Sequence, residues 1–193
     1  MSFGLNIIAF NKFLPNLKKI YGFEVIYDIA KKSYIEELIE CNNLEIIPVA
    51  LGDIDSKTSF LINKNATTCS LCEELTSIPA QDRSNWERVE VDITTLDKYS
   101  SQNNIKPDLI KMDIEGAEMS ALKGGLKTIQ KYRPQLAISI YHSDEDFINI
   151  PLFLKNNLTN YHFALGHYSA HCIETVLYAI PKELVQSPFS LKQ

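Results

Sequence analysis

The sequence predicts an α/β fold with a largely parallel sheet, on three observations. Short apolar runs suited to strands alternate with helical patterns along most of the 193 residues. At Asp108–Glu118 an apolar strand leads through Gly116 into a helical stripe. Near the C-terminus, two strand-like runs with a short connection, Tyr161–His167 and Glu174–Ile180, predict an antiparallel hairpin.

The first part of the chain predicts helix, strand, helix and strand in turn. Apolar residues at helical spacing indicate a first helix over Phe3–Leu14 and a second through Ile29–Ile39. Short strands are expected in three places, Lys18–Glu24, Leu44–Val49 and Thr58–Ile62. The polar segment Asn63–Asn85 has little periodicity and is expected to be a loop.

The middle of the chain predicts a half-buried strand and a capped helix. Apolar and charged residues alternate over Arg88–Ile93, which is typical of a strand with one buried face. The spacing Thr94-x-x-Asp97 resembles a capping box that opens a helix over Leu96–Gln102.

The segments after the acidic strand predict short helices on either side of another strand. The pair Gly124–Gly125 interrupts a helical stripe, which indicates two short helices or one kinked helix. A strand is expected over Leu136–Ile140. Ser143 could cap a turn of helix, and Pro151 is expected to open another short helix.

Composition excludes several classes of function. Nineteen Lys and Arg residues stand against 24 Asp and Glu, a net charge of −5 without a basic block, so nucleic acid is not an expected partner. Four cysteines, with a single Cys69-x-x-Cys72, are too few for a disulfide scaffold or a paired zinc site. No apolar stretch approaches the roughly 20 residues that span a bilayer. A cytoplasmic protein without an integral membrane segment is therefore expected.

Three acids crowd the strand-to-helix turn within Asp108–Glu118. Because neighbouring carboxylates raise each other's pKa, such a cluster predicts a site. Asp113 with Glu115 could bind a cationic cofactor group, coordinate a hard metal ion or accept a proton. Alternatively, the acids complement the dipole at the start of a helix, which suits Glu118 better than Asp113.

Other candidate side chains follow predicted strands, and the carboxyl ends of parallel strands meet at one edge, where ligands bind. Glu24 could hold both hydroxyls of a ribose, or it could be a solvated strand end. His142 and His167 could each accept a proton from an alcohol, although a lone histidine is more often structural. We expect these residues to face a common ligand.

A set of motifs extends over Ile20–Lys182: Ile20–Glu24, Val49–Asp53, Val91–Asp97, Asp108–Glu118, Ala121–Gly124, Pro134–His142 and His167–Pro181. In this order they resemble the FkbM-type S-adenosylmethionine-dependent methyltransferases, and Asp108–Glu118 is the most specific of them. The resemblance implies a class I methyltransferase (Rossmann-like) sheet. It also implies methyl transfer to a hydroxyl, often on a sugar or natural-product acceptor.

The resemblance further implies roles for individual residues, with S-adenosylmethionine as the cofactor. Cofactor contacts are expected at Phe23, Glu24, Ala50, Leu51 and Asp113. His142 would be the base, His167 would lie near the acceptor, and Asp113 or Glu115 would orient the acceptor or the positive end of the cofactor. No metal is expected, because no recognisable ligand set accompanies the acids, although a divalent ion bridging Asp113 and Glu115 stays open.

One feature departs from the family pattern: the sequence starts at the first helix and contains no G-x-G turn. We therefore expect residues 1–193 to form one methyltransferase-like domain that lacks its first strand and is incomplete at the N-terminus. The alternative is a truncated, non-catalytic remnant that binds a ligand or partner. A nicotinamide-dependent oxidoreductase is a third hypothesis, which needs the same glycines. Unpaired central strand edges would favour a homo-oligomer.

Overall fold

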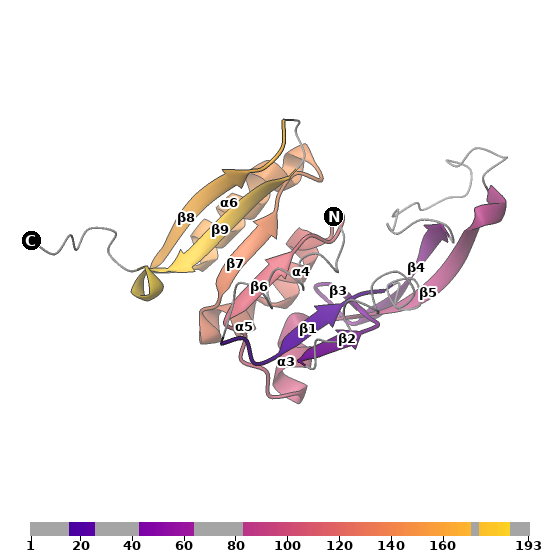
Figure 1. The fold of residues 1–193 in the computed structure, drawn as a ribbon, viewed down its shortest axis with the longest axis horizontal. Coiled ribbons are helices and arrows are strands. Elements are labelled where there is room, and N and C mark those ends of the chain that lie inside the picture. Colours follow the sequence, from indigo (N-terminus) through magenta and orange to yellow (C-terminus); the bar gives the residue numbers. More distant parts are fainter. Residues whose placement is uncertain (1–15, 26–42, 64–82, 171–173, 186–193) are drawn as a thin grey trace, which may run out of the picture. The chain divides into compact units, whose positions relative to one another are not determined.

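The computed structural model describes residues 16–25, 43–63, 83–170 and 174–185, which Figure 1 draws in colour. The chain divides into two compact units, Met1–Thr94 and Thr95–Gln193, which we describe separately. The predicted helices Phe3–Leu14 and Ile29–Ile39 lie outside the described residues, as does most of the predicted loop Asn63–Asn85.

The first unit contains a two-stranded and a three-stranded sheet among its described residues. Strands β1 (Ile20–Phe23) and β2 (Leu44–Ile47) pair in parallel. In the second sheet, β5 (Trp86–Thr94) lies between β3 (Ala50–Leu51), which is parallel to it, and β4 (Ser56–Asn63), which is antiparallel. A 3-10 turn, η2 (Arg83–Asn85), leads into β5.

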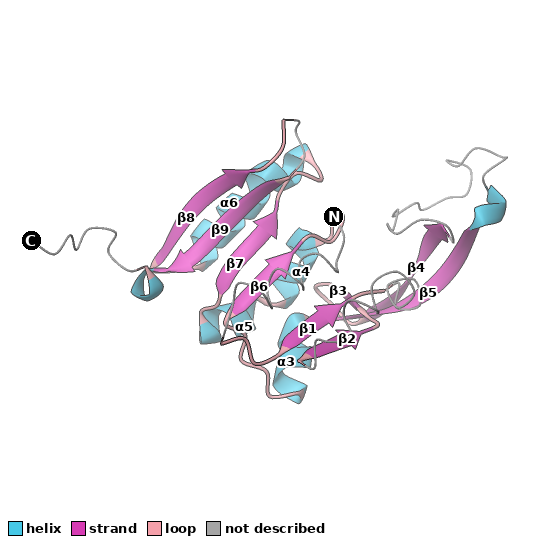
Figure 2. Ribbon diagram, viewed as in Figure 1, coloured by secondary structure: helices cyan, strands magenta, loops and turns pink. Residues whose placement is uncertain are grey.

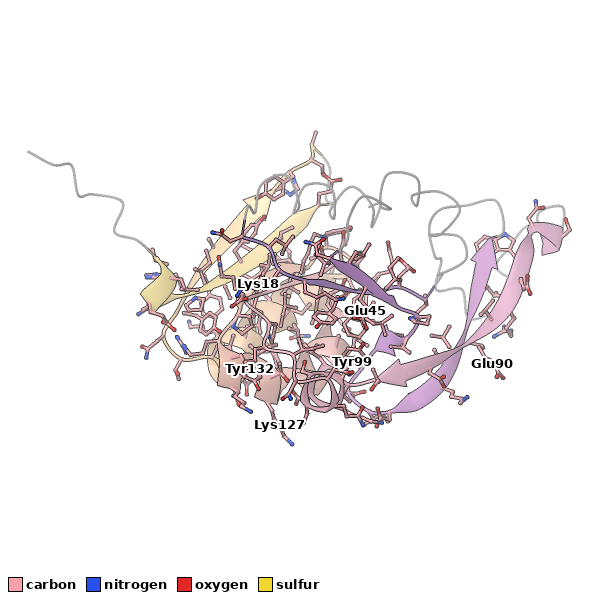
Figure 3. The ribbon with its side chains drawn as sticks, turned by 60° about the horizontal axis from the view of Figure 1, so that its bottom comes forward. Lys18, Glu45, Glu90, Tyr99, Lys127 and Tyr132 are labelled. Carbon is pink, nitrogen blue, oxygen red and sulfur yellow. The ribbon has the colours of Figure 1, made fainter. Side chains whose placement is uncertain are left out.

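Strand β5 has the alternating burial that its sequence predicts. Val91 is buried, whereas its neighbours Glu90 and Asp92 are exposed, and Figure 3 shows Glu90 projecting away from the strand. The predicted minor strand at Thr58–Ile62 is longer in the structure, because all eight residues of β4 pair with β5.

The second unit contains a four-stranded mixed sheet in the order β6-β7-β9-β8. Its strands are β6 (Leu109–Met112), β7 (Gln135–Ser139), β8 (Tyr161–His167) and β9 (Thr175–Pro181). Only β6 and β7 are parallel; β9 is antiparallel to both of its neighbours. The predicted C-terminal hairpin is confirmed, and the fold of the described residues is α/β with mixed sheets.

Four α-helices are described, all in this unit: α3 (Leu96–Gln102), α4 (Glu118–Gly124), α5 (Leu126–Tyr132) and α6 (Asp144–Asn157). A short 3-10 turn, η3 (Lys182–Leu184), follows β9. Figure 2 shows α4 and α6 along one face of the sheet, and these two helices contact each other. No helix among the described residues is both long and apolar enough to cross a membrane.

The glycine pair between α4 and α5 produces two helices, one of the two predicted outcomes. A Cβ on Gly125 would lie 2.8 Å from Cδ2 of Leu96, so α3 approaches the break more closely than a larger residue would allow. Leu96 is buried in this contact.

The capping prediction at the start of α3 needs a correction. The N-cap is Thr95, not Thr94, and its hydroxyl accepts a hydrogen bond from the Lys98 amide. The Thr94 hydroxyl donates instead to Asp55. Asp97 accepts bonds from the backbone amides of α5 at Lys127 and Thr128, so its carboxylate caps a different helix.

The prediction of two short helices after β7 is also wrong, because α6 is one helix with Pro151 inside it. Ser143 does cap it, accepting from the Asp146 amide. Proline in a helix interior costs about 3 kcal/mol. On either side of Pro151, Ile150 and Leu154 are fully buried, and burial of two such side chains contributes about 3–6 kcal/mol, enough to offset the proline.

The burial of each α6 side chain predicts how much its substitution lowers the stability of the protein. Leu154→Ala should lower the free energy of unfolding by about 2–5 kcal/mol, because it removes a fully buried side chain and leaves a cavity. The matched control is Leu152→Ala on the same helix, where the side chain is 51% exposed and the change should stay within about 0.5 kcal/mol. Chemical denaturation measures both, and equal effects would contradict the packing described.

Candidate active site

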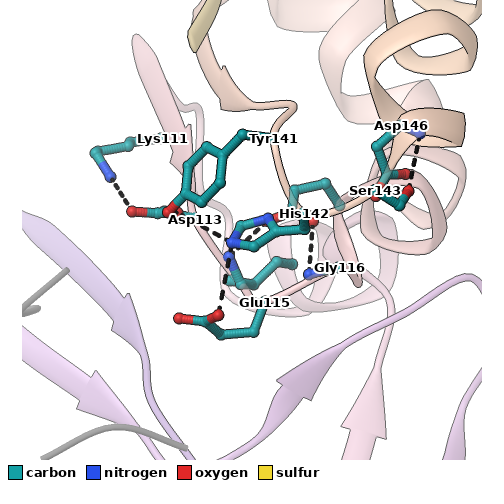
Figure 4. Close-up of polar contacts among 10 residues, drawn as sticks. Lys111, Asp113, Glu115, Gly116, Tyr141, His142, Ser143 and Asp146 are labelled. Carbon is teal, nitrogen blue, oxygen red and sulfur yellow. Dashed lines mark hydrogen bonds and ion pairs between the residues drawn. The ribbon is translucent and has the colours of Figure 1, made fainter. Parts of the chain in front are cut away.

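The candidate site lies where the parallel strands β6 and β7 end. Met112, the last residue of β6, pairs with Ile138 of β7, so the residues that follow both strands emerge at the same edge. Asp113 follows β6, and His142 follows β7; Nε2 of His142 lies 3.7 Å from Oδ1 of Asp113 and 3.6 Å from Oε2 of Glu115. Figure 4 shows these side chains together. The structure thus brings together three of the predicted site residues.

The turn between β6 and α4 is held by Glu118. Its Oε1 accepts a hydrogen bond of 2.7 Å from the amide of Ile114, and its Oε2 accepts one of 3.0 Å from the amide of Gly116. Two residues of this turn, Glu115 and Gly116, have positive φ angles of 56° and 96°. A left-handed Glu is unusual, and glycine tolerates that region without strain, so the carboxylate stabilises a turn of uncommon shape.

Asp113 is held as a carboxylate. The Tyr141 hydroxyl donates a 2.9 Å hydrogen bond to Oδ1, and Nζ of Lys111 lies 3.5 Å from Oδ2. Burial by itself raises the pKa of Asp113, but the charge of Lys111 and the hydroxyls of Tyr141 and Ser139 outweigh it, and the net pKa lies below the usual value. Burial and the bond to Asp113 raise the pKa of Tyr141, which keeps that phenol protonated as a donor.

His142 lies in the middle of the acids. Its Nδ1 is 3.1 Å from Oε1 of Glu118, and its ring centroid lies 4.2 Å from that of Tyr141, with the two ring planes tilted by 38°. The side chain is 10% exposed, and neither ring nitrogen makes an aligned hydrogen bond with a described residue. The contact with Glu118 raises the pKa of His142 above its usual value, against the opposing effect of burial, with further contributions from Glu115 and Asp113.

The same cluster offers ligand atoms to a cation. Asp113, Glu118 and His142 each provide one, all within 4.8 Å of one another. Both Glu118 oxygens already accept backbone hydrogen bonds, and Lys111 and Tyr141 already contact Asp113, so we do not assign a metal here. The excess of carboxylates over neighbouring cations suits a positively charged ligand.

His167 is at the same sheet edge but does not contact this cluster. It ends β8, and β9 lies between β8 and β7, which places it about two strand spacings, ~10 Å, from β7. Its Nδ1 is 2.9 Å from the Thr175 hydroxyl. The predicted role near an acceptor stays a prediction.

The other predicted cofactor residues belong to the first unit. Phe23 ends β1, and the amide of Glu24, directly after it, donates to the carbonyl of Ile47. Ala50 and Leu51 form β3. All four are half-buried, and their predicted roles in cofactor binding stay predictions.

Two site residues carry functions that sequence reasoning missed, Glu118 and Tyr141. The sequence favours a role for Glu118 in complementing the helix dipole; the residue does lie in the first turn of α4, but it is fully buried. Its position two residues after Gly116 was the available signal, because a carboxylate there can reach back to the amides of a tight turn. Nothing in the sequence indicates that Tyr141 would bond to Asp113.

Comparison with known proteins identifies a family and a similar structure. A family model described as methyltransferase FkbM domain matches residues 3–164. The crystal structure of methyltransferase FkbM from Methylobacillus flagellatus KT is similar, with a TM-score of 0.67 and 20% sequence identity over 92% of this chain and 41% of that chain. At that identity the likeness concerns the fold, and this chain spans less than half the length of that protein. No curated protein matches the sequence.

The raised pKa of His142 predicts how stability depends on pH. The stabilisation from its ion pairs is present in full below the unfolded pKa of about 6.5, and it is lost as the pH rises through the higher pKa of the folded protein. The difference in unfolding free energy between wild type and His142→Gln should therefore be largest near about pH 5 and shrink toward about pH 9. Denaturant unfolding across that range measures it, and a difference that grows with pH would contradict the assignment.

Proposed function

The chain belongs to the methyltransferase FkbM family, as its motifs predicted, and on this premise we propose that it transfers a methyl group from S-adenosylmethionine to a hydroxyl of a sugar or natural-product acceptor. The observation that carries the proposal is the position of His142, whose Nε2 faces Asp113 and Glu115 at the edge of β6 and β7. A single methyltransferase-like domain with a largely parallel, Rossmann-like sheet is part of the same proposal.

The charges around the site fit a cationic cofactor. Asp113, Glu115 and Glu118 gather there, with Lys111 and His142 as the neighbouring bases. When bound, S-adenosylmethionine supplies an electrophilic methyl group on a positively charged sulfur. Asp113, ionised and firmly held by Tyr141, would attract the positive end of the cofactor. By family resemblance, Phe23, Glu24, Ala50 and Leu51 would hold its ribose and adenine.

His142 would take the proton from the acceptor hydroxyl as its oxygen attacks the methyl carbon. A histidine with a raised pKa is a stronger base than usual, and the neutral fraction that can accept a proton rises with pH. Nε2 is buried, and the half-exposed carboxylate of Glu115 lies 3.6 Å from it. Glu115 would orient another hydroxyl of the acceptor. Catalysis of this type depends on holding two reactants in line and excluding water.

Binding of the cofactor is the first test. Titration calorimetry of the chain with S-adenosylmethionine should give micromolar binding, and Asp113→Asn should weaken it by removing a negative charge. Lys57→Gln in the first unit, which changes an exposed cation paired with Asp92, is the control and should leave binding unchanged. Absence of binding would favour the alternative of a non-catalytic remnant.

The base is tested by turnover. His142→Ala should reduce methyl transfer by about 10²–10⁴-fold while cofactor affinity changes little, because general-base catalysis contributes about that much. Transfer of a labelled methyl group to a panel of hydroxylated sugars measures it. His162→Ala, at an exposed position on β8, is the matched control and should retain wild-type turnover. If His142→Ala also retains it, His142 is not the base.

A further inference from the structure

Glu118 does more than close the turn that carries the site. Its side chain is fully buried, and burying a carboxylate is unfavourable unless hydrogen bonds or opposite charge compensate. The amides of Ile114 and Gly116 supply two donors. Among the described residues, the imidazole of His142 is a third polar neighbour, with Nδ1 at 3.1 Å from Oε1. The carboxylate therefore contacts both the turn and the proposed base.

The two ring nitrogens of His142 have different surroundings. Nδ1 lies against Glu118, whose carboxylate can only accept a hydrogen bond. Nε2 is farther from its neighbours, at 3.7 Å from Asp113 and 3.6 Å from Glu115, and it has no aligned hydrogen bond with a described residue. A neutral imidazole carries one proton, so the environment decides which nitrogen keeps it.

Three comparisons favour Nδ1 as the protonated nitrogen. Glu118 is nearer than either acid at Nε2, and it is fully buried, whereas the Glu115 side chain is 45% exposed and its charge is better screened. Nζ of Lys111 lies 3.5 Å from Asp113 and offsets part of its charge, whereas among the described residues the carboxylate of Glu118 forms an ion pair only with His142. The Nδ1 contact is short but imperfectly aligned, as is common in catalytic sites before a substrate is bound.

We propose that Glu118 is a positioning residue that holds neutral His142 with its proton on Nδ1, so that the lone pair of Nε2 is available to an acceptor hydroxyl. The catalytic meaning of this inference rests on the function proposed above. When the hydroxyl gives its proton to Nε2, the ring becomes an imidazolium, and Glu118 stabilises the new charge. The proton of the acceptor would move to Nε2, and the electron pair of its O–H bond would form the new bond to the methyl carbon. The C–S bond of the bound S-adenosylmethionine would break, and its electron pair would stay on the sulfur of the departing S-adenosylhomocysteine.

The tautomer can be measured directly in the unaltered protein. Nitrogen NMR of ¹⁵N-histidine-labelled chain distinguishes Nδ1–H from Nε2–H, and His142→Gln identifies the His142 signals by their loss. We expect the Nδ1–H form above the pKa of His142. Observation of Nε2–H as the main neutral form would overturn the proposal, whether or not the protein methylates any acceptor.

A variant then tests whether Glu118 is the cause. Glu118→Gln should shift His142 toward Nε2–H and reduce kcat by about 10²-fold or more with KM little changed, the pattern expected when a base has the wrong tautomer. The pH dependence of kcat in Glu118→Gln should also shift toward lower pH, because the negative charge that favours the imidazolium form of His142 is gone. A folded Glu118→Gln protein with unchanged tautomer and pH profile would overturn the proposal.

Asp97→Asn is the matched control, because Asp97 also accepts two backbone amides at a helix start but no histidine contact involves it among the described residues. It should lose stability and leave the His142 tautomer unchanged. If Glu118→Gln does not fold, the His142 tautomer measured in the unaltered protein still tests the proposal. A wild-type Nδ1–H tautomer without methyl transfer to any acceptor would support the positioning role and refute the proposed reaction.

Discussion

The site depends on one buried carboxylate. Glu118, the first residue of α4, accepts hydrogen bonds from two backbone amides of the turn that precedes the helix, those of Ile114 and Gly116. These bonds hold the left-handed conformations of Glu115 and Gly116, which a free chain would rarely adopt together. Because the same carboxylate contacts His142, the interactions that close the turn also set the position of the ring. Turn geometry and site chemistry are therefore coupled through a single side chain.

The strand pairing beneath the turn supplies the second constraint. Asp113 and His142 meet because β6 and β7 are parallel and in register at Met112 and Ile138. A slip by one residue would turn every side chain of a strand to the opposite face, which the buried core does not permit. The buried apolar residues of this unit include Met112, Ala121, Leu122, Ile129, Leu136, Ile138, Ile140, Ile150 and Leu154. Apolar packing thus fixes the register, and the register places the charged groups.

Neighbouring groups give the titratable residues of the site different protonation states. Lys111 and Tyr141 keep Asp113 ionised despite its burial, whereas the acids around His142 make its ring more basic. Separation of pKa values by environment is the way one site provides both a fixed charge and a proton acceptor. Under the proposed function, the resulting excess of negative charge would attract the positive end of the cofactor.

The sequence by itself determined the type of most elements that the structure describes, the acidic turn, the C-terminal hairpin and the family, because periodicity and short motifs are local properties of the chain. Tertiary packing decided the rest. Burial of Ile150 and Leu154 stabilises α6 enough for the helix to continue past Pro151. Asp97 caps α5 because α3, which contains Asp97, packs against α5. His167 shares an edge with His142 but stays apart from it, since β9 is inserted between their strands. Burial of Glu118 is a result of tertiary packing. Because the buried carboxylate is shielded from water, its electrostatic attraction to His142 is stronger than it would be at the surface.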